Sequence, residues 1–159
     1  TMKCLTELGY DYIMPSPELT GVQLASIAEH SALADRMLIG IHGRTPLMQL
    51  LHCPIKEHKG CQNCMGIAGA VTDEAGRVFP LVNIRYPDNC LVRMLNCRTT
   101  DLIDLFDRIP QTAGYVLNFV GEQIDEVTER IAAANEAMNG KRQTQYPNST
   151  RGHWVRKVE

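Results

Sequence analysis

Short apolar runs alternate with amphipathic stretches along this chain of 159 residues, and they predict strands separated by helices. A brief apolar run over residues 12–14 predicts the first strand. Apolar residues at helical spacing over 20–30 predict the first helix, and Thr20 and Gln23 have the spacing of a capping box at its start. The continuous apolar run over 36–41 has the length of a buried strand. The N-terminal part is therefore predicted to run strand, helix, strand.

The middle of the chain is less regular. Residues 45–65 keep neither the helical nor the strand period for long, and they predict an elaborate loop. Two apolar runs, 68–71 and 78–82, flank a segment of acidic and glycine residues, 72–77, which predicts a β-hairpin. Residues 91–95 predict a further strand. A hairpin inserted after a long loop is thus expected here.

The last third returns to the order of strand and helix. Thr100 is predicted to cap a helix that ends near Pro110, and 115–120 predict the next strand. The last helix is predicted over 122–139, where apolar residues share one helical face: Ile124, Val127, Ile131, Ala134 and Met138. Repeated strand-to-helix units indicate an α/β fold with a mostly parallel sheet. The units are too few for a closed barrel, which takes about 250 residues, so the pattern fits either a small open sheet or part of a barrel.

Composition places the chain among ordinary globular proteins, with 44% hydrophobic and 21% charged residues, and we treat residues 1–159 as a single region. No apolar run approaches the roughly 20 residues that would span a bilayer, and the start has no export signal, so we expect a cytoplasmic protein with no membrane partner. The net charge of −2 indicates no general attraction to nucleic acid.

Four of the six cysteines, Cys53, Cys61, Cys64 and Cys90, fall in or just beyond the irregular segment. Without an export signal, cysteines are better explained as metal ligands or reduced thiols than as disulfides. Thiolates hold both zinc and iron–sulfur clusters. One CxxC pair with two single cysteines lacks the double CxxC of a zinc ribbon, and it favours a cluster whose ligands come from several loops. Structural zinc and plain reduced thiols are the alternatives.

Three other residues, Glu18, His42 and Arg44, lie just past predicted strand ends and are candidates for catalysis. In barrel enzymes the loops that follow the strands carry the chemistry. Arg44 has the side chain to hold a carboxylate or phosphate in a bidentate fork. Glu18 is either a proton acceptor or a local partner in a cap or salt bridge.

Several short motifs occur in order almost from end to end. They are Ser16-Pro17-Glu18-Leu19, then His42-Gly43-Arg44-Thr45-Pro46-Leu47-Met48 leading to Cys53-Pro54, then Cys61-x-x-Cys64, Asp73-x-x-Gly76-Arg77-x-Phe79-Pro80-Leu81, Cys90, Leu95-Asn96 and Thr150-x-Gly152-His153. In these motifs the chain resembles the collagenase-like U-thirty-two peptidase family. The resemblance implies a TIM-type barrel of which this chain covers the later strands, as a fragment of a longer protein.

The resemblance also implies alternatives for function. Family members include iron–sulfur proteins that take part in oxygen-independent hydroxylation of transfer RNA, ribosomal RNA or the ubiquinone precursor, so a 4Fe–4S cluster on the four cysteines is the leading expectation. The rival is a collagenase-like peptidase acting on protein substrates, although the sequence contains no GxSxG elbow and no HExxH helix. The third is a zinc-stapled structural or binding domain.

Partners follow from these alternatives: RNA, a small-molecule substrate or a protein substrate. The apolar edges left by the missing half-barrel require cover, which a second copy of the chain would provide. The fragment alone is expected to be inactive, because a pocket at the mouth of a barrel takes loops from both halves.

Overall fold

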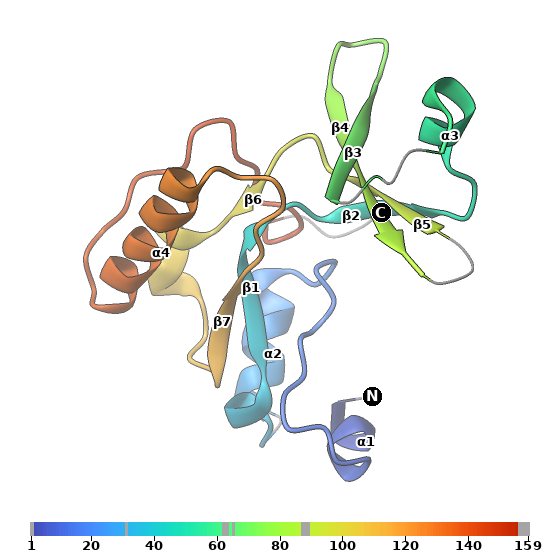
Figure 1. The fold of residues 1–159 in the computed structure, drawn as a ribbon. Helices are drawn as coiled ribbons and strands as arrows, with labels where there is room; N and C mark the ends of the chain where they lie inside the picture. The colour runs from blue at the N-terminus through green and yellow to red at the C-terminus, as the bar shows by residue number, and fades with distance from the viewer. Residues whose placement is uncertain (1, 31, 62–63, 65, 87–89, 156–159) are drawn as a thin grey trace.

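The computed structural model describes residues 2–30, 32–61, 64, 66–86 and 90–155, and it contains two β-sheets with several helices (Figure 1). The first sheet has the order β6-β1-β7, and the second has the order β2-β5-β4-β3. The strands are β1 (Leu38–Gly43), β2 (Pro46–Leu50), β3 (Gly66–Thr72), β4 (Val78–Arg85), β5 (Cys90–Leu95), β6 (Thr100–Asp101) and β7 (Gly114–Leu117). The helices are α1 (Met2–Glu7), α2 (Gly21–His30), α3 (Pro54–Lys59) and α4 (Ile124–Met138), with the 3-10 helices η1 (Ala34–Arg36) and η2 (Ile103–Arg108).

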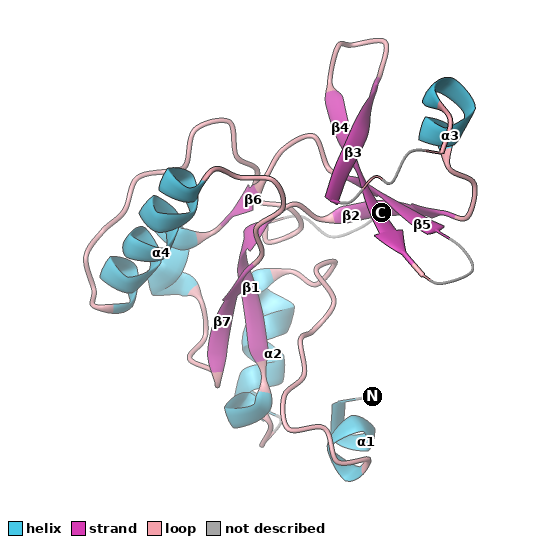
Figure 2. Cartoon of the chain, viewed as in Figure 1, coloured by secondary structure: helices cyan, strands magenta, loops and turns pink. Residues whose placement is uncertain are grey.

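The first sheet carries the main core. β1 runs parallel to β7 and antiparallel to β6, and α4 lies beside this sheet (Figure 2). Apolar side chains from β1, η2, α4 and the residues that flank β1 and η2 pack together there: Met37, Ile39, Ile41, Leu102, Ile103, Ile109, Ala133, Ala134 and Ala137. The predicted strands over 36–41 and 115–120 are confirmed as β1 and β7, each with shifted ends.

Local sequence signals account for two helix starts. The Thr20 amide donates to Oε1 of Gln23 at 2.9 Å, and the Gln23 amide donates to Oγ1 of Thr20 at 3.3 Å. This is the predicted capping box, and it satisfies amides that the first turn of α2 leaves without partners. A second capping box, formed by Gln123 and Glu126, begins α4.

The second sheet is an antiparallel meander, and the predicted hairpin is confirmed as β3 and β4. Its turn is closed by Asp73, whose Oδ1 accepts hydrogen bonds from the amides of Ala75 and Arg77. The Arg77 amide, together with the Arg77 guanidinium, holds the pKa of the Asp73 carboxyl below its ordinary value. The acidic and glycine-rich composition of 72–77 therefore encodes the turn directly.

Three expectations are wrong. Residues 45–65 are not one loop, because they contain β2 and α3. β2 has mostly exposed side chains and no alternation, and it forms because its backbone pairs with β5. The sheets are not mostly parallel either: β1 with β7 is the only parallel pair among the described strands.

The third error concerns Thr100. It does not cap an α-helix, because it belongs to β6, and Leu102 precedes a 3-10 helix instead. The pairing of His42 with Asp101 and of Gly43 with Thr100 draws this segment into the first sheet. The fold is thus a mixed α/β arrangement, and no closed barrel is present in the described part of the chain.

Helix α4 turns its small residues and one arginine toward the core. Arg130, Ala133, Ala134 and Ala137 are buried. The larger apolar residues of the predicted face are exposed, with Ile124 at 81%, Ile131 at 45% and Met138 at 56%. The predicted apolar face is therefore only partly turned inward, because close packing against η2 and the first sheet selects the alanines.

No helix in the described ranges is both long and apolar enough to cross a membrane.

Met37 offers a test of where the core lies, because its side chain is fully buried while that of Met14 is 59% exposed. We expect Met37→Ala to lower the free energy of unfolding by about 2 to 5 kcal/mol, through lost burial and the cavity left behind. Met14→Ala is the matched control and should change it by less than about 0.5 kcal/mol. Urea unfolding followed by circular dichroism measures both, and equal effects would contradict this assignment of the core.

Candidate functional site

The four cysteines singled out in the sequence line one cavity of about 500 Å³ in the second sheet. Cys53 precedes the first turn of α3, and Pro54 at its start favours helix formation there. Cys61 follows the end of α3, Cys64 lies shortly before β3, and Cys90 begins β5. Pairing of β3, β4 and β5 therefore brings together thiols that are separated along the chain.

Asn83 of β4 also lines this cavity and makes the closest polar contact with a thiol. Its side chain is 8% exposed, and its Nδ2 donates to Sγ of Cys64 at 2.9 Å and to the Cys64 carbonyl at 3.5 Å. Its Oδ1 is buried and has no hydrogen-bond partner in the structure as described. Sequence analysis missed Asn83, because an asparagine within an apolar strand has no recognisable spacing to the cysteines.

The donor set of this cavity fits an iron–sulfur cluster in kind. Thiolates are the usual cluster ligands, and hydrogen bonds to their sulfurs are the usual outer contacts. Within the described residues, no three His, Cys, Asp or Glu side chains lie close enough together to hold a single metal ion.

His42 lies in the interior, where it contacts a carboxylate that sequence analysis missed. Its Nδ1 is 2.7 Å from Oδ2 of Asp101, and both side chains are 1% exposed. The Nη1 atom of Arg130 lies 4.0 Å from the same oxygen, and its guanidinium lies 4.5 Å from the centroid of the Tyr146 ring. The His42 ring also contacts Phe119, with centroids 5.2 Å apart. His42 thus belongs to a buried charged network.

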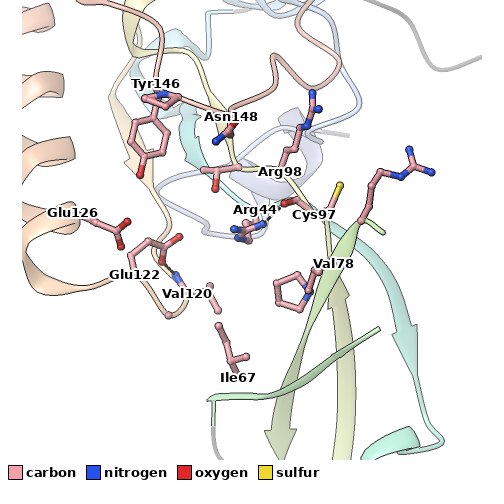
Figure 3. A pocket seen from close by; sticks show the side chains of 15 residues that line it. Arg44, Ile67, Val78, Cys97, Arg98, Val120, Glu122, Glu126, Tyr146 and Asn148 are labelled. Carbon is pink, nitrogen blue, oxygen red and sulfur yellow. Dashed lines mark hydrogen bonds between the residues drawn. The ribbon is translucent and has the colours of Figure 1, made fainter. Parts of the chain in front are cut away.

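Arg44, two residues further along, lies at a different cavity. This cavity of about 470 Å³ opens between the two sheets, and we call it the inter-sheet cavity (Figure 3). The Nη1 atom of Arg44 donates to the carbonyls of Asn96 at 2.9 Å and Cys97 at 2.7 Å. These two bonds hold the guanidinium at the cavity wall.

Tyr146 also lines the inter-sheet cavity. Burial raises the pKa of its phenol above the ordinary value, and the carboxylate of Glu126 raises it further, while the charge of Arg130 opposes the shift. The phenol is therefore a neutral hydrogen-bonding group at physiological pH.

The third catalytic candidate lies elsewhere. Glu18 is exposed in the turn before α2, where its amide donates to Oγ of Ser16 at 3.3 Å. It lines neither the cysteine cavity nor the inter-sheet cavity. The structure therefore gathers the four cysteines, but it distributes Glu18, His42 and Arg44 over three different environments.

The buried network around Asp101 leads to a stability prediction. Asp101→Asn removes the negative charge that faces His42 and Arg130 in the interior, and among the described residues Arg130 keeps only its ion pair with Glu129 at 2.7 Å. We expect a loss of about 3 kcal/mol or more in the free energy of unfolding. Asp107→Asn, at an exposed position of η2, is the control and should have little effect. Similar urea midpoints for the two variants would show that the network does not stabilise the fold.

Comparison with protein-family models, with curated proteins and with solved structures finds no match for this chain. The similarity to the U-thirty-two peptidases accordingly rests on the short motifs in the sequence.

Proposed function

We propose that this chain is the later part of a TIM-type barrel of the U-thirty-two peptidase kind, from an iron–sulfur enzyme that supports oxygen-independent hydroxylation or related modification of RNA or a quinone precursor. One observation carries the proposal: Cys53, Cys61, Cys64 and Cys90 line a single cavity. In this proposal the four thiolates bind a 4Fe–4S cluster.

The arrangement of the ligands supports a cluster over zinc. The thiols come from the start of α3, the segment after it, the approach to β3 and the start of β5. Only one CxxC pair is present, and the other two cysteines are single. A cavity that is lined by four separated thiols suits a larger group better than a single ion.

A bound cluster would supply electron transfer. The chain's own residues would hold it and set its surroundings. Asn83 donates a hydrogen bond to the Cys64 sulfur, which stabilises negative charge on that ligand and fixes its orientation. The half-buried Ile55 adds apolar surface beside the cysteines, whereas Leu51 at the rim is 86% exposed.

The peptidase alternative has no comparable support. His42 is paired with Asp101 in the interior and is not exposed to a substrate in solution. A zinc-stapled domain remains the other outcome of the metal measurement below.

We also propose that the barrel is completed outside this chain. Among the described strands, β7 pairs only with β1, so its other edge has no strand partner. Ile124, Ile131 and Met138 of α4 are exposed. The missing half-barrel or a second copy of the chain would cover these apolar groups. A cytoplasmic location belongs to the same proposal, because reducing conditions keep thiols available as ligands.

The first test is the content of metal and acid-labile sulfide, together with the absorption spectrum, after purification without oxygen. We expect about four irons and four sulfides per chain, and loss of both in a Cys61→Ser, Cys64→Ser double variant. A Cys4→Ser, Cys97→Ser double variant is the matched control, since neither residue lines the cysteine cavity, and it should keep the cluster. Stoichiometric zinc, or no metal in the unmodified chain, would overturn the proposal.

Asn83 provides a second test. Asn83→Leu removes the hydrogen bond to Cys64 without changing the number of thiols. We expect iron content to be retained and the reduction potential of the cluster to fall by about 40 mV, which corresponds to about 1 kcal/mol for a one-electron couple. Asn96→Leu, at a site outside the cysteine cavity, serves as the control. A potential equal to that of the unmodified protein would show that the contact does not influence the cluster.

A further inference from the structure

Arg44, at the wall of the inter-sheet cavity, has one guanidinium edge that no described residue uses. Both hydrogens of Arg44 Nη1 are taken by the carbonyls of Asn96 and Cys97. The Nε and Nη2 atoms have no hydrogen-bond partner among the described residues, and Arg44 forms no ion pair there. Nε and Nη2 together are a fork that matches the two oxygens of a carboxylate. The backbone therefore holds Nη1 of Arg44, while the Nε and Nη2 edge is available to bind a carboxylate.

Two carboxylates line the same cavity on the α4 side (Figure 3). One oxygen of Glu122 accepts a hydrogen bond from the Val120 amide, and one oxygen of Glu126 accepts from the Gln123 amide. The second oxygen of each has no partner in the described structure. Neither carboxylate forms an ion pair with Arg44. Opposite charges therefore share the cavity without neutralising each other.

The remaining wall is mixed, with an apolar part, one aromatic phenol and the polar side chains of Thr99 and Asn148. Ile67, Val78, Pro80 and Pro147 line it together with Tyr146. Two further arginines lie at the wall: Arg77 is paired with Asp73 at 2.7 Å, and Arg98 is exposed and forms no ion pair among the described residues. The volume of about 470 Å³ lies in the range of small-molecule sites.

We propose that the inter-sheet cavity binds a small zwitterion, namely an α-amino acid with an apolar side chain. The carboxylate binds the free Nε and Nη2 edge of Arg44, and the ammonium group binds between Glu122 and Glu126. The apolar side chain lies against Ile67 and the two prolines. This inference goes beyond the proposed function and does not depend on it, because the two cavities share no lining residue.

The charges of the cavity disfavour simpler ligands. A phosphate or dicarboxylate would pair with Arg44 and Arg98, but it would leave Glu122 and Glu126 without a cationic partner and bring negative charge toward them, where like charges repel. A plain amine would satisfy the glutamates and leave the guanidinium edge without a partner. Only a ligand with both charges pairs with both sides.

The test measures binding of l-phenylalanine by titration calorimetry and by saturation-transfer NMR. Two analogues each lack one charge: N-acetyl-l-phenylalanine has no ammonium group, and 2-phenylethylamine has no carboxylate. We expect saturable binding of l-phenylalanine, with binding of each analogue weaker by about tenfold or more. The absence of saturable l-phenylalanine binding at millimolar concentration, or equal binding of either analogue, would overturn the proposal.

Variants assign the binding to the cavity. Arg44→Lys keeps the charge but loses the fork, and Glu122→Gln keeps an acceptor for the Val120 amide but loses the charge; each should weaken l-phenylalanine binding about tenfold. The controls are Arg142→Gln and Glu74→Gln, both exposed and outside the cavity, and they should bind as the unmodified chain does. Circular dichroism confirms folding of each variant. If folded Glu122→Gln binds with unchanged affinity, the proposed placement is wrong.

Discussion

The buried carboxylate of Asp101 connects more parts of this fold than any other polar group described here. Its Oδ2 lies 2.7 Å from Nδ1 of His42 in β1 and 4.0 Å from Arg130 of α4. Its Oδ1 accepts a hydrogen bond from the Ile103 amide at the start of η2. Its backbone bonds to Thr150 and Arg151 near the C-terminus. Because a buried charge is tolerated only with partners, these elements have to meet at this point.

Arg44 has the corresponding role between the two sheets. It leaves the end of β1 and donates to the carbonyls of Asn96 and Cys97, just after β5. The Asn96 amide in turn donates to the Thr45 carbonyl. The ends of β1 and β5 are thereby held together, which creates the inter-sheet cavity beside them. The cysteine cavity is formed separately, within the second sheet and α3, so the two sites are built from different elements.

Much of the local structure follows from the sequence for identifiable reasons. The Thr20 and Gln23 capping box, the turn at Asp73 and the apolar run of β1 depend on neighbouring residues, and these expectations are confirmed. β2 was missed because its strand form comes from pairing with β5. Thr100 was misjudged because pairing with Gly43 of β1 decides its conformation. Backbone pairing between distant segments leaves no periodic signal in either one.

The candidate sites likewise combine features that are local in the sequence with features that depend on contacts between distant segments. The four cysteines, Glu18, His42 and Arg44 are recognisable as candidates without a structure, because thiol, carboxylate, imidazole and guanidinium chemistry belongs to a residue type wherever it lies in the fold. The fold is needed to show that Asn83 contacts Cys64, that His42 is paired with Asp101, and that α4 buries Arg130. Contacts of this kind depend on distance and burial, and those are set by how sheets and helices pack together.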